Sequence, residues 1–212
     1  MLKKCALGIL IATASLSAQA SDLDYSYIQA DFSGLNLSTD DNSASNGFNL
    51  DDNLSGYDVA GSFGFAEHFY AFAGYADVDG DSRVQGIKVD TTFTEFYVGG
   101  GYHMSVSENT DWLIEASYVD DEFKASAMGI SDSVSDSGFR IASGIRGQFT
   151  GKSEATVKFN YTDVNDFGDG FGVDIEAVYH VTKHFGITAG WEFGARDDVD
   201  LMYWNVGARY SF

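Results

Sequence analysis

Basic residues, cysteine, proline and long apolar runs are all scarce in this 212-residue chain. The one cysteine, Cys5, lies near the start, so the rest of the chain offers no disulfide, haem or thiolate chemistry. Proline is absent altogether, which is consistent with long strand ladders that need every backbone donor. After the first 20 residues, no stretch has the roughly 18 consecutive apolar residues of a membrane-spanning helix.

Charge is strongly unbalanced. Twelve Lys and Arg stand against 32 Asp and Glu, and the formal net charge is −20. The phosphates of nucleic acids would repel so acidic a chain, which excludes a nucleic-acid partner. Aromatic residues nevertheless make up 15% of the chain, so disorder is not expected and an apolar environment must accommodate them.

The N-terminal segment has the pattern of a secretory signal peptide. A positive start with Lys3 and Lys4 precedes an apolar run, and Ala18-Gln19-Ala20 forms a small-x-small cleavage site. The run is too short for a membrane span, although a monotopic anchor is an alternative. We therefore predict Sec-type export with cleavage near Ala20, which also removes Cys5. Residues 1–20 are then the leader and residues 21–212 a single domain.

The last eleven residues alternate with a period of two. The positions on one face are Met202, Trp204, Val206, Ala208, Tyr210 and Phe212, and the intervening positions are mostly polar or small. This period indicates a β-strand with one face in an apolar medium. A free strand edge with such a face invites aggregation, whereas a closed barrel has no edge and lipid solvates the face.

Ten segments share this two-residue period. They span residues 24–37, 56–66, 69–78, 92–103, 111–121, 138–149, 155–163, 171–181, 185–194 and 202–212. The third segment has aromatics on both faces, so its register is ambiguous. Connections after odd segments, such as 38–55, 79–91 and 122–137, are longer than those after even segments. We therefore predict an all-β fold: a closed antiparallel transmembrane β-barrel of about ten strands, with short periplasmic turns and longer external loops. Eight strands are the fallback, and a soluble β-sandwich is the alternative fold.

Charges of both signs fall on the predicted inward face. They are Glu95, Glu115, Arg140, Arg146, Lys158, Asp174, Glu176, Glu192 and Arg209. Inside a narrow barrel such charges must be paired, because an unpaired buried charge is costly. A structural polar plug is the favoured interpretation, and a small conducting pathway is the alternative. Eight to ten strands leave no room for a wide porin.

Acidic clusters mark the predicted external loops. Asp77-x-Asp79-Gly80-Asp81 is similar to the start of a calcium loop, but Ser82 and Lys88 stand where that loop needs glycine and glutamate. Further acidic pairs are Asp40-Asp41, Asp51-Asp52 and Asp197-Asp198. We interpret these clusters as solvated loops. Divalent cations that bridge lipopolysaccharide phosphates are candidate ligands, and no cofactor or defined metal site is predicted.

The histidines argue against catalysis. His68, His103, His180 and His184 all fall at predicted periplasmic ends or turns, whereas outer-membrane proteases of the omptin type use a histidine at the external rim. His180 and His184 lack a defined third metal ligand. His103-Met104-Ser105 is superficially similar to the His-x-Ser of lipid A deacylases, without the surrounding motif. No catalytic residue is predicted.

The chain resembles bacterial outer-membrane barrels. Trp204, Val206, Ala208, Tyr210 and Phe212 match their C-terminal signature, which the resemblance implies is read by the barrel assembly machinery. The stretches 25–32, 69–75 and 97–102 resemble the outer-membrane β-barrel domain family that includes OmpX-like proteins. They are most similar to barrel proteins once labelled quorum factors in plant-pathogenic bacteria.

The resemblance implies a cell outer membrane location in a Gram-negative envelope and no catalytic residues. We expect a monomer with a structural or surface-interaction role, in contact with outer-membrane lipid and lipopolysaccharide. A narrow cation-preferring, porin-like channel is the alternative, because acidic loops would concentrate cations. A lipid-modifying enzyme or protease is the third hypothesis.

Overall fold

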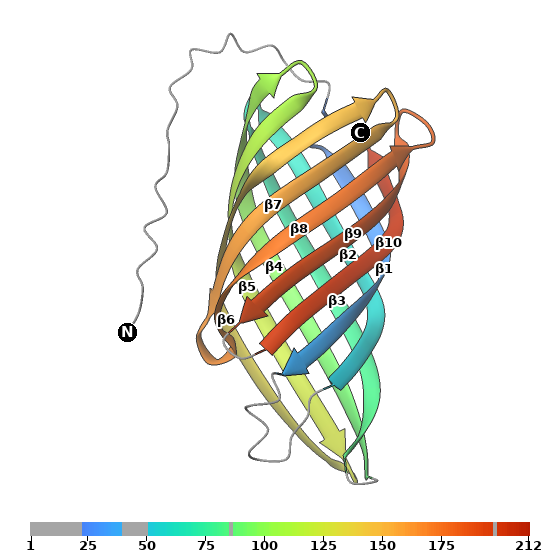
Figure 1. The fold of residues 1–212 in the computed structure, drawn as a ribbon, viewed down its shortest axis with the longest axis vertical. Helices are drawn as coiled ribbons and strands as arrows, with labels where there is room; N and C mark the ends of the chain where they lie inside the picture. Colours follow the sequence, from blue (N-terminus) through green and yellow to red (C-terminus); the bar gives the residue numbers. More distant parts are fainter. Residues whose placement is uncertain (1–22, 40–50, 85–86, 197–198) are drawn as a thin grey trace.

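The computed structural model describes residues 23–39, 51–84, 87–196 and 199–212, which form one closed antiparallel barrel (Figure 1). Each strand pairs with its neighbours in the chain, and β1 closes the barrel against β10. The strands are β1 (Tyr27–Thr39), β2 (Asp51–Ala66), β3 (Phe69–Val84), β4 (Ile87–Ser107), β5 (Thr110–Ala127), β6 (Ile130–Thr150), β7 (Ser153–Val164), β8 (Gly168–His180), β9 (Phe185–Arg196) and β10 (Val199–Ser211). The predicted fold class is confirmed, with ten strands rather than eight.

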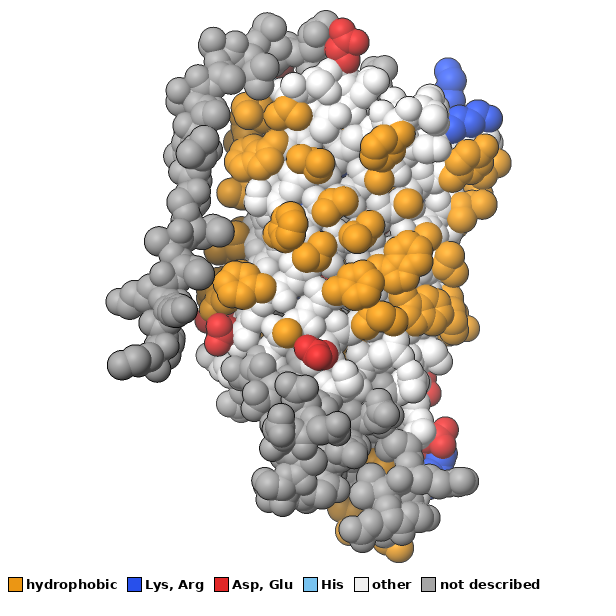
Figure 2. All heavy atoms as spheres, in the orientation of Figure 1, with side chains coloured by type: hydrophobic (Ala, Val, Ile, Leu, Met, Phe, Trp, Pro, Cys, Tyr) orange, Lys and Arg blue, Asp and Glu red, His pale blue; other side chains and the backbone are white. Residues whose placement is uncertain are grey.

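Apolar side chains form a belt around the outside of the barrel. In β6, Phe139, Ile141 and Ile145 are exposed, whereas the intervening Ala142 and Arg146 are buried. Figure 2 shows this belt, with acidic side chains at its lower margin. Large apolar side chains exposed on every strand are expected where lipid rather than water surrounds the barrel. No described residues form a helix that is long and apolar enough to cross a membrane.

Two hairpins extend further than the sequence analysis predicts. Residues 79–91 and 122–137 are predicted as loops, and this is wrong: β3 and β4 reach Val84 and Ile87, and β5 and β6 meet at a two-residue turn. In that turn Met128 (φ 53°) and Gly129 (φ 81°) both adopt the left-handed region, as a type I′ hairpin turn requires. Polar Ser, Thr and Asp residues still form strands here because adjacent strands supply a ladder.

The other connections follow the prediction in part. Those after even strands are short, at residues 67–68, 108–109, 151–152 and 181–184. A long connection after an odd strand remains only between β1 and β2, where residues 40–50 lie outside the described part of the chain. Residues 164–170, the connection expected between the seventh and eighth predicted segments, are mostly strand: β7 ends at Val164, a 3-10 turn covers Asn165–Phe167, and β8 begins at Gly168. The predicted leader, residues 1–20, also lies outside the described residues.

The two ends of the barrel differ, and we name them by their connections. The short-turn end carries the four short turns and Phe212, and it is uppermost in Figure 1. The long-hairpin end carries the β3–β4 and β5–β6 hairpins, which project beyond the other strands at the bottom of the view. Both ends of the described chain, β1's start and β10's finish, lie at the short-turn end because Tyr27 pairs with Ser211.

Apolar side chains also fill part of the interior. Towards the long-hairpin end, Leu35, Leu54 and Val78 form a buried cluster, with Phe93 and Leu201 packed against it. A second buried cluster lies at the short-turn end and comprises Leu23, Tyr25, Tyr70 and Leu113. The two clusters occupy the lumen at two levels, and the charged residues lie mainly between them.

Candidate functional site in the barrel lumen

The middle of the lumen is crossed by ion pairs between strands. Arg140 on β6 contacts Glu95 on β4 at 2.7 Å and donates to Thr162 as well. Lys158 on β7 lies 2.9 Å from Glu115 on β5 and 4.0 Å from Asp174 on β8. The Arg140–Glu95 and Lys158–Glu115 pairs join strands that are not adjacent in the sheet, so they tie the barrel wall together from inside, whereas Lys158 and Asp174 are direct neighbours on adjacent strands.

Two arginines are held closer to the short-turn end. Arg209 on β10 lies 2.7 Å from Glu176 on β8 and donates to the side-chain oxygen of Gln29 on β1 at 2.8 Å. Arg146 on β6 contacts Glu154 on β7 at 2.6 Å, and both side chains are almost completely buried. Burial in this low-dielectric interior makes such pairs costly to break.

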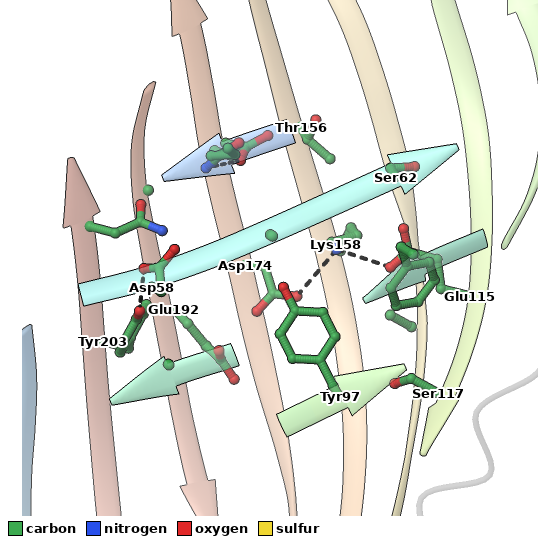
Figure 3. A pocket seen from close by; sticks show the side chains of 18 of the residues that line it. Asp58, Ser62, Tyr97, Glu115, Ser117, Thr156, Lys158, Asp174, Glu192 and Tyr203 are labelled. Atoms are coloured by element: carbon green, nitrogen blue, oxygen red, sulfur yellow. Dashed lines mark hydrogen bonds and ion pairs between the residues drawn. The ribbon is translucent and has the colours of Figure 1, made fainter. Parts of the chain in front are cut away.

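A cavity of about 250 Å³ lies between the apolar clusters. Tyr97 projects into it, and Asp58, Asp174 and Glu192 line its wall, as Figure 3 shows. Asp174 and Glu192 are direct cross-strand neighbours on β8 and β9. The structure thus places all nine predicted inward charges inside the barrel and brings eight of them into ion pairs, while Glu192 faces the cavity.

Several charged side chains in the lumen lie outside the set predicted from the sequence. Arg196 contacts the fully buried Asp121 at 2.8 Å, but the sequence places them at the margins of predicted loops. Glu154 is missing from the predicted set because it falls in the turn expected between residues 149 and 155. Asp31 and Asp58 lie on the predicted inward faces of β1 and β2, so strand parity alone could have identified them.

A hydrogen-bonded cluster occupies the short-turn end. The fully buried Asp111 accepts hydrogen bonds from Tyr25 at 2.8 Å and Ser105 at 2.8 Å, and it lies 3.1 Å from His103. Tyr25, which precedes β1, stacks on His103, and burial raises the pKa of its phenol above the ordinary range. Asp111 therefore sits between the serine and the histidine, so Ser105 is not positioned by His103 as a nucleophile is by its base.

The remaining histidines serve local contacts at the same end. His180 lies 2.8 Å from Glu154, and His184 lies 2.9 Å from the carbonyl oxygen of Ser211. The ring of His68 packs against His103. In the described part of the chain, no three His, Cys, Asp or Glu side chains are grouped to hold a metal ion.

The acidic motif of residues 77–81 lies on a strand rather than in a loop. Asp77, Asp79 and Asp81 alternate along β3, so they share its outer face and do not converge as a calcium loop does. Tyr75, in the apolar belt, donates to Asp77 at 3.2 Å. Of the other acidic pairs, 40–41 and 197–198 lie outside the described residues, and residues 51–52 begin β2.

The C-terminal strand forms one side of the barrel closure. Its alternate residues, from Trp204 to Phe212, lie on the outer face, where Trp204 packs against Phe32 of β1. This outward face comprises the predicted signature residues Trp204, Val206, Ala208, Tyr210 and Phe212. β10 pairs with β1 along its full length, from Tyr27 with Ser211 to Thr39 with Val199.

The closed ten-stranded barrel, its apolar belt and its filled interior define a small outer-membrane β-barrel. The chain belongs to the family described as outer membrane protein beta-barrel domain, whose model matches residues 6–169. The match ends just inside β8, so β9 and β10 lie beyond it. No curated protein sequence matches the chain.

Solved structures of outer-membrane barrels are similar to this chain at low identity. The translocator domain of the autotransporter NalP from Neisseria meningitidis is 12% identical over 91% of this chain and 91% of that chain, with a TM-score of 0.53. Ail, the attachment invasion locus protein of Yersinia pestis, is 18% identical over 88% of this chain and 97% of that chain, with a TM-score of 0.48. Neisserial surface protein A is 11% identical over 88% of this chain and 96% of that chain, also with a TM-score of 0.48.

Proposed function

We propose that this protein is a non-catalytic outer-membrane barrel that presents an interaction surface to the cell exterior. The observation that carries the proposal is the sheet that projects at the long-hairpin end. β2 and β3 are last paired at Ser55 and Asp79, and β6 and β7 at Gly138 and Val164. Beyond these points, β3, β4, β5 and β6 continue to pair only with one another.

The outer edge of β6 supports the same proposal. Residues 130–135 pair with β5 on one side, and no described strand pairs with them on the other. Met128 and Ile130 at the tip are 83% and 77% exposed, and Val134 is exposed as well. An exposed strand edge with apolar side chains is a template for strand addition, unless a partner covers it.

The filled lumen favours this surface role over conduction. Two apolar clusters and the ion pairs between them fill much of the described lumen around a cavity of about 250 Å³, which favours a plug over an open pore. Catalysis is disfavoured because Asp111 separates Ser105 from His103.

A narrow cation-preferring channel is the second candidate. The observation in its favour is that ten carboxylates point into the described lumen against five Lys and Arg side chains: Asp31, Asp58, Glu95, Asp111, Glu115, Asp121, Glu154, Asp174, Glu176 and Glu192 against Arg140, Arg146, Lys158, Arg196 and Arg209.

The remaining partners follow from the location. The long-hairpin end faces the exterior, where its outer acidic residues meet lipopolysaccharide and divalent cations that bridge its phosphates. The apolar belt contacts membrane lipid, and the barrel assembly machinery reads the C-terminal signature. The protein acts as a monomer, since the closed barrel has no unpaired strand within the membrane.

Conductance measurements test the first step of the proposal. The mature protein is refolded, its folding is checked by heat-dependent mobility in a gel, and it is inserted into a planar bilayer. We expect no steady conductance steps from the folded barrel. Steady cation-selective steps would instead favour the channel, and Arg140→Ala and Arg146→Ala would then change the selectivity of an open pore.

Site-specific crosslinking tests the interaction surface. A photo-reactive residue replaces Ser133 on the outer edge of β6, and a matched variant carries it at Ser107 next to the β4–β5 turn. In intact cells we expect adducts with extracellular or outer-leaflet molecules from position 133 alone. Equal adduct patterns at both positions, or none at 133, would contradict a surface role for this edge.

A further inference from the structure

A group of oxygen-bearing side chains lies on the inner wall where β1 meets β2 and β10. Asp31 on β1 and Asp58 on β2 are direct cross-strand neighbours. Ser33, two residues along β1, is paired with Asn205 on β10. Asp31 and Ser33 are buried, and Asp58 and Asn205 line the luminal cavity. The group therefore spans the three strands that close the barrel.

Among the described residues, the hydrogen-bond donors to the two carboxylates are neutral groups. Asp31 accepts from the Thr188 hydroxyl at 2.5 Å and from the Gln29 amide at 2.6 Å. Asp58 accepts from the Tyr203 hydroxyl at 2.5 Å, and it stands directly opposite Asp31 in the β1–β2 ladder. Two carboxylates so close together in a low-dielectric interior repel each other unless a cation or a proton lies between them.

No basic side chain in the described part of the barrel supplies that cation. The five Lys and Arg residues inside the described barrel each form an ion pair with another carboxylate: Arg140 with Glu95, Arg146 with Glu154, Lys158 with Glu115, Arg196 with Asp121 and Arg209 with Glu176. Among the described residues, no Lys or Arg forms an ion pair with Asp31 or Asp58. Gln29 stands between Asp31 and Arg209, accepting from the arginine and donating to the carboxylate.

Two further oxygen atoms of the group have no hydrogen-bond partner. The Ser33 hydroxyl is completely buried, and its oxygen has no hydrogen-bond partner at normal bonding geometry among the described residues. The side-chain oxygen of Asn205 is likewise buried without a partner. Buried polar atoms are nearly always satisfied, so these two oxygens are suited to a ligand that offers positive charge.

We infer that this group binds a hard cation of the Ca²⁺ class. Carboxylate, amide and hydroxyl oxygens are the ligands that such cations take, and water completes the shell. The group has two carboxylates, so neutral oxygens from Ser33 and Asn205 supply the rest. A cation bound by Asp31, Asp58 and Asn205 joins β1, β2 and β10, and it therefore stabilises the closure of the barrel from the inside.

The test uses the mature chain, residues 21–212, refolded in detergent with either Ca²⁺ or EDTA present. Refolding in each condition is needed because the closed lumen would slow exchange of a bound ion. The unfolding temperature is read from heat-dependent gel mobility, and bound Ca²⁺ is counted by equilibrium dialysis. The variants are D31N, D58N and Ser33→Ala, and the matched control is D79N/D81N, which removes two outward acids on β3.

We expect Ca²⁺ to raise the unfolding temperature of the wild type and of D79N/D81N. D31N and D58N should lose that rise and bind one Ca²⁺ fewer per chain than the wild type, and Ser33→Ala should bind Ca²⁺ more weakly. If one Asn variant does not fold, the other and Ser33→Ala still decide the question. An equal rise in all variants would overturn the inference, since Ca²⁺ would then act on the outer surface.

A shared proton is the competing explanation, and the same variants distinguish it. In that case Ca²⁺ and EDTA give the same unfolding temperature at neutral pH. One Asn substitution would then stabilise the barrel at that pH, because an amide replaces a protonated carboxyl without needing the proton. That combination would also overturn the cation site.

Discussion

Arg146 illustrates what a charge requires inside this barrel. Its guanidinium donates to Glu154 at 2.6 and 3.1 Å and lies 4.8 Å from the centre of the Tyr25 ring. Glu154 in turn contacts His180. The pair is almost completely buried, so water cannot replace either partner when the other is removed.

Arg146→Ala should therefore be strongly destabilising. Removal of the guanidinium leaves Glu154 buried without its arginine, a change that costs about 3–5 kcal/mol in comparable sites. Urea unfolding of the refolded barrel measures the effect. The control, Lys152→Ala, alters an exposed cation in the adjacent β6–β7 turn and should change stability by less than about 0.5 kcal/mol. Similar losses for both variants would contradict the structural role of the pair.

Backbone proximity restricts a second class of residue. Gly56 lies inside β2 opposite Val78, and a methyl group there would overlap with the carbonyl oxygen of Asp77. Gly56→Ala should lower the free energy of unfolding by about 1–3 kcal/mol, because the β2–β3 ladder must shift to admit it. Gly100→Ala is the control, since its methyl group would lie 3.7 Å from the nearest atom, the carbonyl oxygen of Tyr70. Equal stability of the two variants would refute this explanation.

At the scale of elements, the central strands are much longer than a membrane crossing needs. β4 and β6 have 21 residues each and β5 has 18, whereas about 10 tilted residues span a bilayer. The residues of β5 and β6 beyond this length lie at the long-hairpin end. There they pair with each other and with β4, within the projecting sheet. Formation of the hairpin tip therefore depends on the barrel, whereas the stability of the barrel depends little on the tip.

Shortening the β5–β6 hairpin tests this independence. Residues 124–133 are replaced by Asn-Gly, which favours the type I′ turn now made by Met128 and Gly129. We expect the unfolding free energy of the barrel to change by less than about 1 kcal/mol, because no apolar luminal residue is lost. Failure of the shortened chain to fold would show that the projecting sheet is part of the core.

At the scale of the whole molecule, apolar packing closes a lumen whose charge is negative. Leu35, Leu54 and Val78 form the closing layer towards the long-hairpin end. Behind it, inward carboxylates outnumber inward Lys and Arg by two to one in the described residues. Removing the layer would therefore expose a cation-attracting chamber to solvent.

The variant Leu35→Ala/Leu54→Ala/Leu113→Ala, which removes side chains from both apolar clusters, should accordingly begin to conduct, with a preference for cations, because a negative lumen concentrates them. Each substitution costs roughly 2–5 kcal/mol of stability, so folding must be verified by gel mobility before conductance is recorded. Leu113→Ala alone is the matched control and should remain silent, because the layer of Leu35 and Leu54 is intact. Anion-selective steps from the triple variant would contradict the charge argument.

The sequence alone was sufficient for the class of fold and for the direction of most side chains. Phe139, Ile141 and Ile145 point outwards and Arg140 and Arg146 inwards because a strand alternates faces with no tertiary information. The same parity places all nine predicted charges in the lumen. It could not determine where β3 to β6 end, because polar residues such as Ser133 and Asp81 are compatible with both loops and strands when solvent surrounds them.

The partners of each side chain were decided only by closure of the barrel. Arg140 meets Glu95 and Lys158 meets Glu115 across 45 and 43 residues of sequence, and Tyr203 reaches Asp58 across 145. Register and barrel circumference set these encounters, and neither is encoded in a local period. A two-residue alternation thus determined a membrane barrel with a charged interior, while the tertiary structure decided which charges pair and which two, Asp31 and Asp58, are left facing each other.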